Sequence, residues 1–479
     1  MPNIEAKQAI VQEIADKMKN AQGTVVVDYR GLNVEEVTEL RKKARENNID
    51  YKVYKNSMMR FAAKEAGVEG LLDVLVGPTA IAFCEDDPVA PAKLINDFAD
   101  VYKRQIEDHK ITVVGPDIDD PQFDGVDVVR IPFGLEIKVA GKAMQSDFES
   151  VLERRLHYFL NYIEGSMHVG QRNICWVRLT KEAFDAGFRL RHFGEVVYAK
   201  MLDEFGKVVD KVEVTIYTKE EDVVRLEEEL VKPIYNVRDD RLNSLTDESV
   251  DVFYTCTLCQ SFAPSHVCVV TPERLGLCGA VSWLDSKATK ELDPTGPAQP
   301  IEKNGVIDER LGAWEEVNDV VAKCSQGAVE KVTLYSILED PMTSCGCFEC
   351  ICGIMPEANG VVIVNREFGG MTPTGMTFGE LASMTGGGVQ TPGFMGHGRH
   401  FISSKKFMAA EGGIERIVWM PKELKDDVAE RLNKSVQELY GIENFTDMVC
   451  DETIAVDSEA VLEFLTEKGH PALEMDPIM

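Results

Sequence analysis

The sequence predicts a multidomain chain of α/β and α+β class, with a small N-terminal α/β domain followed by two larger mixed domains. Its 479 residues, 44% of them hydrophobic, are enough for several cores. Strand-like runs alternate with helix-like runs, which is typical of mixed folds. The charge also changes near residue 100. Residues 1–99 contain 13 basic and 16 acidic residues, whereas residues 100–479 contain 38 and 65.

The first predicted domain covers residues 1–99. A buried strand is expected at Thr24–Val27, then a helix with Leu40 on its apolar face, then a strand at Tyr51–Tyr54. The segment from Val76 continues as a strand, an acidic turn and a helix. These segments resemble the N-terminal RNA-binding domain of the ribosomal stalk-base protein, the tenth protein of the large subunit.

The stalk-base resemblance implies contacts with ribosomal RNA in this part of the chain. Basic side chains would contact phosphates, and small polar side chains would support them. The matching positions are Arg30, Lys52, Lys55, Asn56 and Arg60. The alternative is that a helix face rich in lysine and arginine is simply solvated.

Residues 100–105 have the sequence DVYKRQ. The DNA sequence GATGTGTATAAGAGACAG can encode these six residues, and it is a transposon end used to build sequencing libraries. The stalk-base resemblance ends just before these six residues, and a second resemblance begins just after them. We therefore predict an adapter-like junction between two gene fragments. The alternative is a helix end that happens to have this sequence.

The second predicted domain covers residues 106–245. Strands are expected at Ile111–Val114, Val126–Ile131 and Val212–Ile216, and helices at Phe148–Glu164 and Glu220–Leu230. An aromatic residue and several cations in this domain could hold an anionic nucleotide. These residues are Trp176, Arg172, Arg178, Arg189 and Arg191. Alternatively, the tryptophan belongs to the core and the arginines pair with surface carboxylates.

The third predicted domain covers residues 246–479. Strands are expected at Gly360–Val364 and Arg416–Met420, and a C-terminal helix at Lys422–Leu439. Nine of the twelve cysteines lie between Cys256 and Cys352, and this density indicates metal binding rather than disulfides. We expect them on loops between short strands.

Two cysteine sets stand out in this domain. Four cysteines with the spacing C-x2-C-x8-C-x9-C are enough to hold a four-iron cubane, and they are Cys256, Cys259, Cys268 and Cys278. The tripeptide Cys345-Gly346-Cys347 can offer two thiolates and the two amide nitrogens between them. Such a planar set suits square-planar nickel(II) or copper(II) and suits zinc poorly.

The segments around these cysteines resemble acetyl-CoA synthase, a nickel–iron–sulfur enzyme. FYTCTLCQSFAPSHVCVVTPERLGLCGAVSWLD, EDPMTSCGCFECICGIMPEANG and GGGVQTPGFMGHGRHFIS carry the resemblance, which extends from about Ile106 to the C-terminus. It implies the assembly of acetyl-CoA from carbon monoxide, a methyl group from a corrinoid iron–sulfur protein, and CoA. It starts inside the family's middle domain, whose beginning we expect to be missing.

The resemblance also assigns roles to individual residues. The four cysteines of the first set would ligate a [4Fe–4S] cluster, and Cys259 would bridge to a proximal nickel ion. Cys345 and Cys347 would complete that ion's thiolates and, with the Gly346 and Cys347 amides, chelate a distal nickel ion. Phe262 would limit access to the proximal nickel. CoA would bind through the tryptophan and arginines of the second domain.

Several alternatives remain open at this point. Cys350 and Cys352 could join the tripeptide in a four-thiolate zinc knot, which would leave the cubane spacing unexplained. His266, His397 and His400 could be ligands, although the thiolates suffice. An electron-transfer iron–sulfur protein would explain the cubane but not the tripeptide. A ribosomal RNA-binding protein with an appended metal domain would explain residues 1–99.

Charge and hydropathy limit the compartment and the partners. The acidic surface of residues 100–479 disfavours nonspecific nucleic-acid binding. The N-terminus has no apolar signal core, and no stretch reaches the ~18 apolar residues of a membrane span. We therefore expect a cytoplasmic protein with no membrane contact. The resemblance implies a carbon monoxide dehydrogenase subunit and a corrinoid iron–sulfur protein as partners.

Overall fold

The computed structural model describes residues 3–28, 34–75, 79–117, 127–141, 147–148, 151–152, 155–156, 159, 166–167, 176–243, 245–261, 263–343 and 348–479. The chain divides into two compact units, Met1–Ala143 with Cys175–Ser244, and Met144–Ile174 with Leu245–Met479. Each unit contains helices and several small sheets, which confirms the predicted mixed class. The domain boundaries predicted from the sequence stay predictions.

The N-terminal region of the first unit is a three-stranded sheet with helices on both faces. The strands lie in the order β1-β3-β2, with β3 antiparallel to both neighbours. Their bounds are Gly23–Asp28 for β1, Asp50–Val53 for β2 and Thr79–Cys84 for β3. The helices are α1 (Asn3–Asn20), α2 (Val34–Glu46), α3 (Asn56–Ala66) and α4 (Ala90–Gln105).

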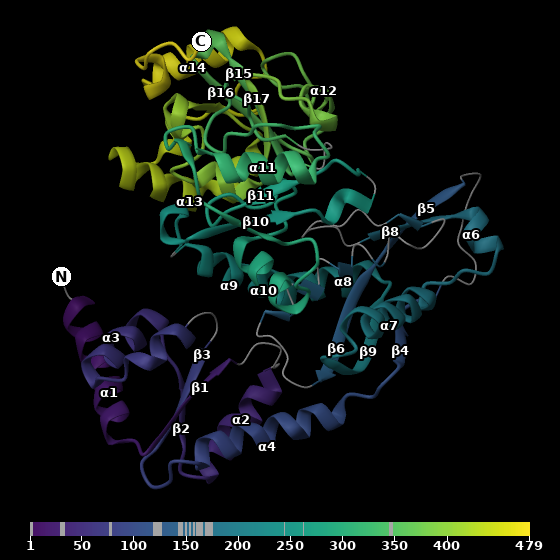
Figure 1. The fold of residues 1–479 in the computed structure, drawn as a ribbon, viewed down its shortest axis with the longest axis vertical. Coiled ribbons are helices and arrows are strands. Elements are labelled where there is room, and N and C mark those ends of the chain that lie inside the picture. The colour runs from purple at the N-terminus through teal and green to yellow at the C-terminus, as the bar shows by residue number, and fades with distance from the viewer. Residues whose placement is uncertain are drawn as a thin grey trace. The chain divides into compact units, whose positions relative to one another are not determined.

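The alternation of β3 explains why both faces of this sheet are covered. Ile81 and Phe83 pack with residues of α1 and α3, whereas Ala80 and Ala82 pack with α2 and α4 on the other face (Figure 1). All residues of β3 are buried as a result. The strands and helices predicted for residues 1–99 are thus confirmed.

The predicted junction forms part of one helix. Residues 100–105 are the last six residues of α4, which begins at Ala90. Within the described part of the chain, the two cores of the N-terminal region contain no residue beyond Phe98. The adapter-like origin of residues 100–105 stays a prediction.

The rest of the first unit contains three further strand pairings, in two sheets. In one sheet, β9 pairs in parallel with β4 and antiparallel with β6, and helix α7 packs closely at Gly194, where a side chain would collide with Ile111. In the other, β5 pairs antiparallel with β8. The strands are β4 (Lys110–Val114), β5 (Val128–Pro132), β6 (Gly134–Gly141), β8 (Trp176–Thr180) and β9 (Val209–Tyr217). The helices are α6 (Lys181–Asp185), α7 (Arg191–Phe205), α8 (Glu220–Leu226) and α9 (Lys232–Leu242).

The second unit is built on three sheets. Their orders are β11-β10-β12, β13-β14 and β17-β15-β16-β18. The strands of the first two are β10 (Val252–Cys256), β11 (Cys268–Val270), β12 (Pro300–Glu302), β13 (Val306–Asp308) and β14 (Ala313–Trp314). The strands of the third are β15 (Cys350–Met355), β16 (Gly360–Asn365), β17 (Phe394–His397) and β18 (Ile417–Trp419). A further two-residue strand is β7 (Ser166–Met167).

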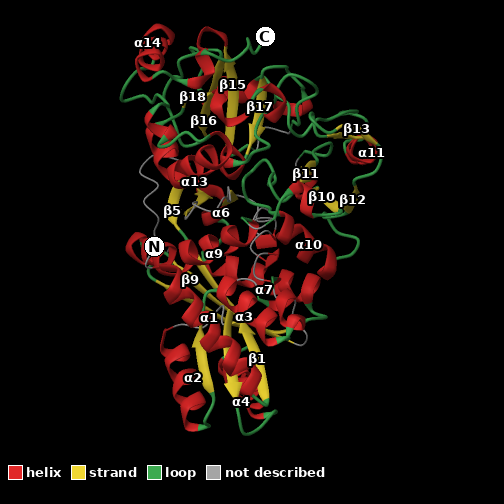
Figure 2. Ribbon diagram, turned by 90° about the vertical axis from the view of Figure 1, so that its left-hand side faces the viewer, coloured by secondary structure: helices red, strands yellow, loops and turns green. Residues whose placement is uncertain are grey.

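Helices cover both faces of the four-stranded sheet (Figure 2). Helix α13 (Lys422–Tyr440) packs on the face that carries Cys350 and Cys352, and α14 (Ser458–Lys468) packs on the face that carries Val362. The remaining helices of this unit are α10 (Trp283–Leu292), α11 (Glu315–Cys324) and α12 (Phe378–Ser383).

Most elements predicted for residues 106–479 are confirmed within a few residues. Strands β4, β5, β9, β16 and β18 and helix α13 lie where the sequence places them. The helix predicted at Glu220–Leu230 ends at Leu226 and continues as a π-helical turn over Glu227–Val231. The helix predicted at Phe148–Glu164 lies largely outside the described residues.

Candidate metal centre

Two of the four cubane cysteines face each other across a strand pair. Cys256 is the last residue of β10 and Cys268 is the first residue of β11, and the two are direct antiparallel partners. Both side chains are buried thiols. They therefore sit at strand ends rather than in loops, and the strand register sets their proximity.

The other two cysteines lie in the connections that leave this strand pair. Cys259 belongs to a short 3-10 helix, Leu258–Ser261, and Cys278 follows Leu277 in a turn. Both are half-buried thiols. The Gln260 amide braces the first connection by donating to the carbonyls of His266 and Cys324, each at 2.9 Å.

The tripeptide Cys345-Gly346-Cys347 lies outside the described residues, but both of its flanks are described. After it, the Glu349 amide donates to the Leu277 carbonyl at 2.9 Å, directly beside Cys278. Before it, the Thr343 hydroxyl donates to the carbonyls of Thr385 and Val389. These two residues flank the glycine-rich run Gly386–Gly388. The residues that flank the tripeptide therefore lie beside other candidate segments: Glu349 lies beside Cys278, and Thr343 lies beside Thr385 and Val389.

A small cavity marks where these segments converge. Its volume is about 70 Å³, and one wall comes from the loop between Cys259 and Cys268, another from the residues before the tripeptide, and a third from the glycine-rich run. Its lining comprises Ala263, Ser265, His266, Val267, Val321, Val329, Val332, Met342, Thr343, Gly387 and Gly388. Gly387 and Gly388 therefore lie beside the loop between Cys259 and Cys268.

Glu349 and Arg399 hold the segment that follows the tripeptide. Arg399 donates to the Glu349 carboxylate from its backbone amide at 2.8 Å and from Nε at 2.5 Å, and from Nη1 to Asp427 at 2.8 Å. Gly279 is required beside this carboxylate, because its φ is +73° and a Cβ atom would lie 1.8 Å from Glu349 Oε2. The turn after Cys278 is therefore fitted to Glu349.

The three histidines considered as ligands have different surroundings. Nε2 of the buried His266 lies 3.2 Å from the sulfur of Cys268. His397 donates from Nδ1 to the Gly398 carbonyl at 3.0 Å, and burial lowers its pKa to about 4. His400 accepts a bond from Arg431 at 2.9 Å. Of these three contacts, that of His266 is with a candidate ligand.

Cys350 and Cys352 lie on the other face of β15 from Ile351, which packs in the same core as Cys256 and Cys268. Both are fully buried, and burial raises the pKa of both thiols, that of Cys352 to about 12. A metal-binding thiolate is disfavoured in such surroundings. Their placement argues against the four-thiolate zinc knot.

The donor set can be compared with the groups it is expected to hold. Among the described residues, no three His, Cys, Asp or Glu side chains gather as the ligands of a single ion would. A cubane takes one thiolate at each iron, so its ligands surround a cluster instead of a point. Two thiols that are cross-strand partners, and two more on the connections that leave this strand pair, fit a cubane in their chemistry.

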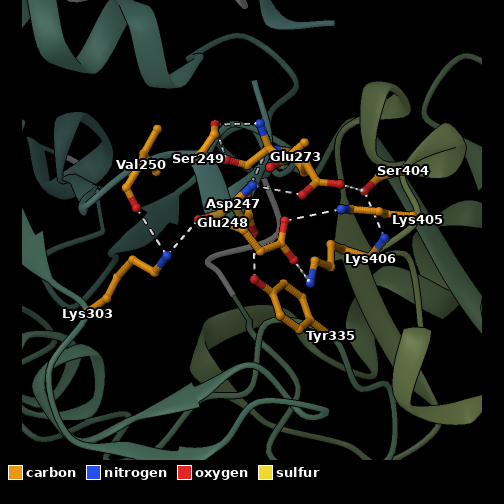
Figure 3. A network of polar contacts seen from close by, with 11 residues as sticks. Asp247, Glu248, Ser249, Val250, Glu273, Lys303, Tyr335, Ser404, Lys405 and Lys406 are labelled. Carbon is orange, nitrogen blue, oxygen red and sulfur yellow. Dashed lines mark hydrogen bonds and ion pairs between the residues drawn. The ribbon is translucent and has the colours of Figure 1, made fainter. Parts of the chain in front are cut away.

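Sequence reasoning missed a polar network beside this site. Asp247 and Glu273 each accept the other's backbone amide, at 3.1 and 2.9 Å, and the Tyr335 hydroxyl donates to Asp247 at 2.7 Å (Figure 3). Burial raises the pKa of both carboxyls. Arg274, next in the chain, is fully buried. The sequence signal that could have identified this network is the charged segment Pro272-Glu273-Arg274, which lies between the predicted ligands Cys268 and Cys278.

The candidate CoA residues are only partly described. Trp176 and Arg178 lie on β8, opposite Pro132 and Arg130 of β5, and Arg172 is outside the described residues. Arg189 donates to the carbonyls of Phe184 and Phe188 at 3.1 and 2.8 Å. Arg191 pairs with Asp117 at 3.0 Å, as the surface-carboxylate alternative expects. The CoA assignment stays a prediction.

The candidate RNA residues lie on β2 and at the start of α3. Lys52 is exposed and 3.4 Å from Glu13, and the exposed Lys55 precedes α3. The Asn56 side chain accepts a bond from the Thr79 hydroxyl, and Arg60 donates to the Leu75 carbonyl at 3.2 Å. Arg30 and Phe262, the residue expected at the proximal nickel, lie outside the described residues.

No helix in the described part of the chain has both the length and the apolar character needed to cross a membrane. Comparison with known families divides the chain into three segments. Residues 235–479 match the family of the C-terminal part of the ACS/CODH beta subunit, and residues 95–223 match the CO dehydrogenase/acetyl-CoA synthase complex beta subunit family. Residues 2–100 match ribosomal protein L10.

Curated relatives match more than three quarters of the chain. The carbon monoxide dehydrogenase/acetyl-CoA synthase subunit alpha of Moorella thermoacetica is 54% identical over 381 residues, which are 79% of this chain and 51% of the relative. The acetyl-CoA decarbonylase/synthase complex subunit beta of Methanopyrus kandleri is 45% identical over 371 residues, covering 77% of this chain and 76% of the relative. The chain thus spans about half the length of the first relative.

A solved structure of the C-terminal domain of the acetyl-Coenzyme A synthase Alpha subunit is also similar. It is 55% identical and covers 28% of this chain and 100% of that chain, with a TM-score of 0.27.

Proposed function

The chain belongs to the CO dehydrogenase/acetyl-CoA synthase beta subunit family, and on this basis we propose that residues 106–479 form a CO-methylating acetyl-CoA synthase, an acyltransferase. The substrates are carbon monoxide, a methyl group on a corrinoid, and CoA. The carbonyl carbon gains one bond to the methyl group and one to the CoA sulfur. The corrinoid cobalt keeps the electron pair of its broken bond to carbon, and the CoA thiol releases its proton.

The observation that carries this proposal is that the segment following the tripeptide lies beside a predicted cubane ligand. The backbone bond from Glu349 to Leu277 brings this segment next to Cys278. Cys256, Cys259, Cys268 and Cys278 would hold a [4Fe–4S] cluster. Cys259, Cys345 and Cys347 would hold a proximal nickel ion, and Cys345, Gly346 and Cys347 a distal one. When bound, the nickel ions supply the site at which the carbon–carbon bond forms.

The chain's own residues hold this site and control access to it. The strand register fixes Cys256 and Cys268, while Arg399 and Glu349 fix the segment after the tripeptide. Phe262, three residues after Cys259 in the sequence, would limit access to the proximal nickel. In the first unit, Trp176 and its neighbouring arginines, Arg172, Arg178, Arg189 and Arg191, would bind CoA.

The names of the relatives describe subunits of multi-protein complexes, which supports the proposed partners. We propose that a carbon monoxide dehydrogenase subunit and a corrinoid iron–sulfur protein bind this chain in the cytoplasm. The burial of Cys350 and Cys352 on the other face of β15 disfavours the four-thiolate zinc alternative. The tripeptide favours a synthase over an electron-transfer protein, which would leave it without a role.

The match of residues 2–100 to ribosomal protein L10 supports a separate proposal for this region. We propose that it binds ribosomal RNA through Arg30, Lys52, Lys55, Asn56 and Arg60, and that residues 100–105 are a junction between unrelated gene fragments. Long-read sequencing of the source DNA across this junction tests the second statement. A continuous reading frame without the adapter-like hexapeptide would contradict it.

Anaerobic reconstitution of the full chain with iron, sulfide and nickel tests the synthase. We expect about four irons and two nickels per chain, with one nickel resistant to mild chelators because amide nitrogens close its ring. The loaded chain should then form acetyl-CoA from a methylated corrinoid protein, carbon monoxide and CoA. Binding of zinc alone, without iron, would contradict the proposal.

A further inference from the structure

His266 is a buried imidazole in direct contact with a predicted cluster ligand. The residue is 4% exposed, and its Nε2 atom lies 3.2 Å from the sulfur of Cys268. Four thiolates already provide one ligand for each iron of a cubane. The contact of His266 with Cys268 therefore has no part in the predicted ligand set, and it needs an explanation of its own.

The loop that carries His266 connects two predicted ligands, Cys259 and Cys268, and hydrogen bonds hold it in place. The Ala263 amide donates to the Cys259 carbonyl, and the His266 amide donates to the Ala263 carbonyl, each at 2.9 Å. The His266 carbonyl accepts a bond from the Gln260 side chain at 2.9 Å. Both polar backbone groups of His266 are thus bonded, and the fold sets the position of its ring beside Cys268.

The surroundings of this contact are largely apolar. His266 lines the cavity of about 70 Å³ together with the side chains of Val321, Val329 and Val332. These three valines belong to the same hydrophobic core as Cys268. A hydrogen bond in such surroundings is electrostatically stronger than the same bond in water. A bond between the ring and the sulfur therefore has a larger effect here than it would at the surface.

Binding of a cluster determines which of the two groups donates. In the metal-free chain, the Cys268 thiol and the imidazole are both able to donate a hydrogen. A cysteine that ligates a metal has lost its proton, so its sulfur can only accept. The contact is then a hydrogen bond only if Nε2 carries the hydrogen, as it does in one neutral tautomer of histidine.

We propose that His266 is a positioning residue for the iron–sulfur cluster, which donates from Nε2 to the Cys268 sulfur and thereby stabilises the bound cluster and raises its reduction potential. This inference rests on the proposed function, which places the cluster on Cys268 and its partners. Reduction adds negative charge to the cluster and its sulfurs, and the positive end of the N–H group favours that state. Loss of such a partner typically weakens metal binding about 10–100-fold.

The first test detects the hydrogen bond by its spectroscopic signature. The full chain, grown with ¹⁵N-labelled histidine, is loaded anaerobically with iron and sulfide but without nickel, and the reduced cluster is studied by pulsed electron paramagnetic resonance. We expect a weak ¹⁵N coupling in the wild type. It should disappear in His266→Gln, which removes one of the eight labelled histidines. A coupling as strong as that of a coordinated imidazole would overturn the hydrogen-bond role in favour of ligation.

The second test measures the midpoint potential by redox titration of the same nickel-free chain. His266→Leu removes the donor, so its potential should be more negative than that of the wild type, and it should lose iron faster to a chelator. His266→Gln should keep a potential close to that of the wild type, because its amide can donate from about the place of Nε2. If His266→Leu assembles no cluster, His266→Phe takes its place as a ring without a donor.

His470→Leu is the matched control for this measurement. His470 is also buried, at 1% exposed, but its Nε2 donates to the Ile417 carbonyl at 3.1 Å instead of contacting a sulfur. This control should weaken the metal-free fold and leave the potential of the cluster unchanged. A shift as large as that of His266→Leu would show that loss of a buried imidazole, and not of the bond to sulfur, changes the potential.

The outcomes also distinguish this inference from the proposed function. A wild-type chain that binds no iron would overturn both. An iron-loaded wild type without a ¹⁵N coupling from His266 would overturn only the role of His266. The same holds if the potential is unchanged in His266→Leu or is shifted equally in His266→Leu and His266→Gln.

Discussion

The N-terminal region and the C-terminal unit bury different kinds of side chain. Between residues 3 and 98, no charged side chain is buried among those described. In residues 245–479 the buried groups include charged and titratable side chains. Examples are Asp247, His266, Glu273, Arg274, Asp285, His397, Arg416, Lys425, Asp451 and His470.

This difference indicates where the chain carries its chemistry. A small sheet covered on both faces by apolar helix residues is stable without buried charge, and its ion pairs, such as Lys17–Asp50, stay at the surface. Buried polar groups oppose folding unless they are paired, so a region rich in them usually holds a site or a specific contact. The contrast leads to predictions that differ in sign or size between the two regions.

The largest expected effect concerns the cysteines. Cys268→Ser should remove nearly all of the about four irons per chain, because it deletes a ligand whose place the strand register fixes. Cys347→Ser should keep the iron and lose the nickel. Metal analysis of the reconstituted full chain measures both, and residues 1–99 provide an internal control whose hydrogen exchange should not change.

Cys352→Ser is the matched control for these two variants. Its sulfur is buried on the other face of β15 from Ile351 and donates to a carbonyl, a bond that a serine hydroxyl can also make. We expect full loading with iron and nickel. If this variant loses as much nickel as Cys347→Ser, the tripeptide assignment is wrong and the four-thiolate knot is the better hypothesis.

The second prediction compares one ion pair from each region. Lys425 and Asp451 are 11% and 2% exposed, whereas Lys17 and Asp50 are 27% and 42% exposed. Lys425→Met should lower the free energy of unfolding of its unit by about 3–5 kcal/mol, because it leaves a buried carboxylate unpaired. Lys17→Met should cost its region about 0–1 kcal/mol. Urea unfolding measures both, and equal effects would contradict the contrast.

The sequence was sufficient for the parts of the fold that follow from local patterns. Alternating or continuous apolar runs placed β1, β4, β9 and β16, and the cysteine spacing identified the candidate ligands. It was insufficient for contacts between distant segments. The register that opposes Cys256 to Cys268 depends on strand pairing, and the bond from Glu349 to Leu277 joins residues far apart in the chain.

Arg274 shows the same limit most clearly. An arginine next to proline and glutamate in a short turn has the pattern of a surface residue, and most arginines are exposed. Its burial follows from residues such as Leu334, Met395 and Phe401, which close over it only in the folded chain. Local sequence alone therefore could not distinguish this cation from a solvated one.

The third prediction tests whether residues 1–98 fold independently. Leu40 is a buried residue of α2, in a core that, as described, contains no residue beyond Phe98. Leu40→Ala should lower the stability of this region by about 2–5 kcal/mol. Hydrogen exchange measured by mass spectrometry should show faster exchange in peptides from residues 3–98 only. A simultaneous loss of protection in residues 245–479 would indicate cooperative folding and argue for a true fusion.

The smallest expected effect is a pH dependence confined to the histidine-containing region. Residues 1–99 contain no histidine, whereas the buried His470 donates from Nε2 to the Ile417 carbonyl at 3.1 Å and accepts the Ala472 amide at Nδ1. Burial lowers its pKa to about 4. Between about pH 6.5 and 4 the unfolded chain binds a proton that the folded chain does not. The free energy of unfolding therefore decreases as the pH is lowered, by up to about 3 kcal/mol.

Tryptophan fluorescence can follow this effect without a signal from residues 1–99, because they contain no tryptophan, and Trp419 is fully buried next to β16. His470→Gln keeps a donor for the Ile417 carbonyl but cannot take up the proton. Its unfolding free energy should depend less on pH over this interval than that of the wild type. The remaining dependence should come partly from His397, whose pKa burial also lowers to about 4. An unchanged slope in His470→Gln would show that His470 does not couple folding of this unit to protonation.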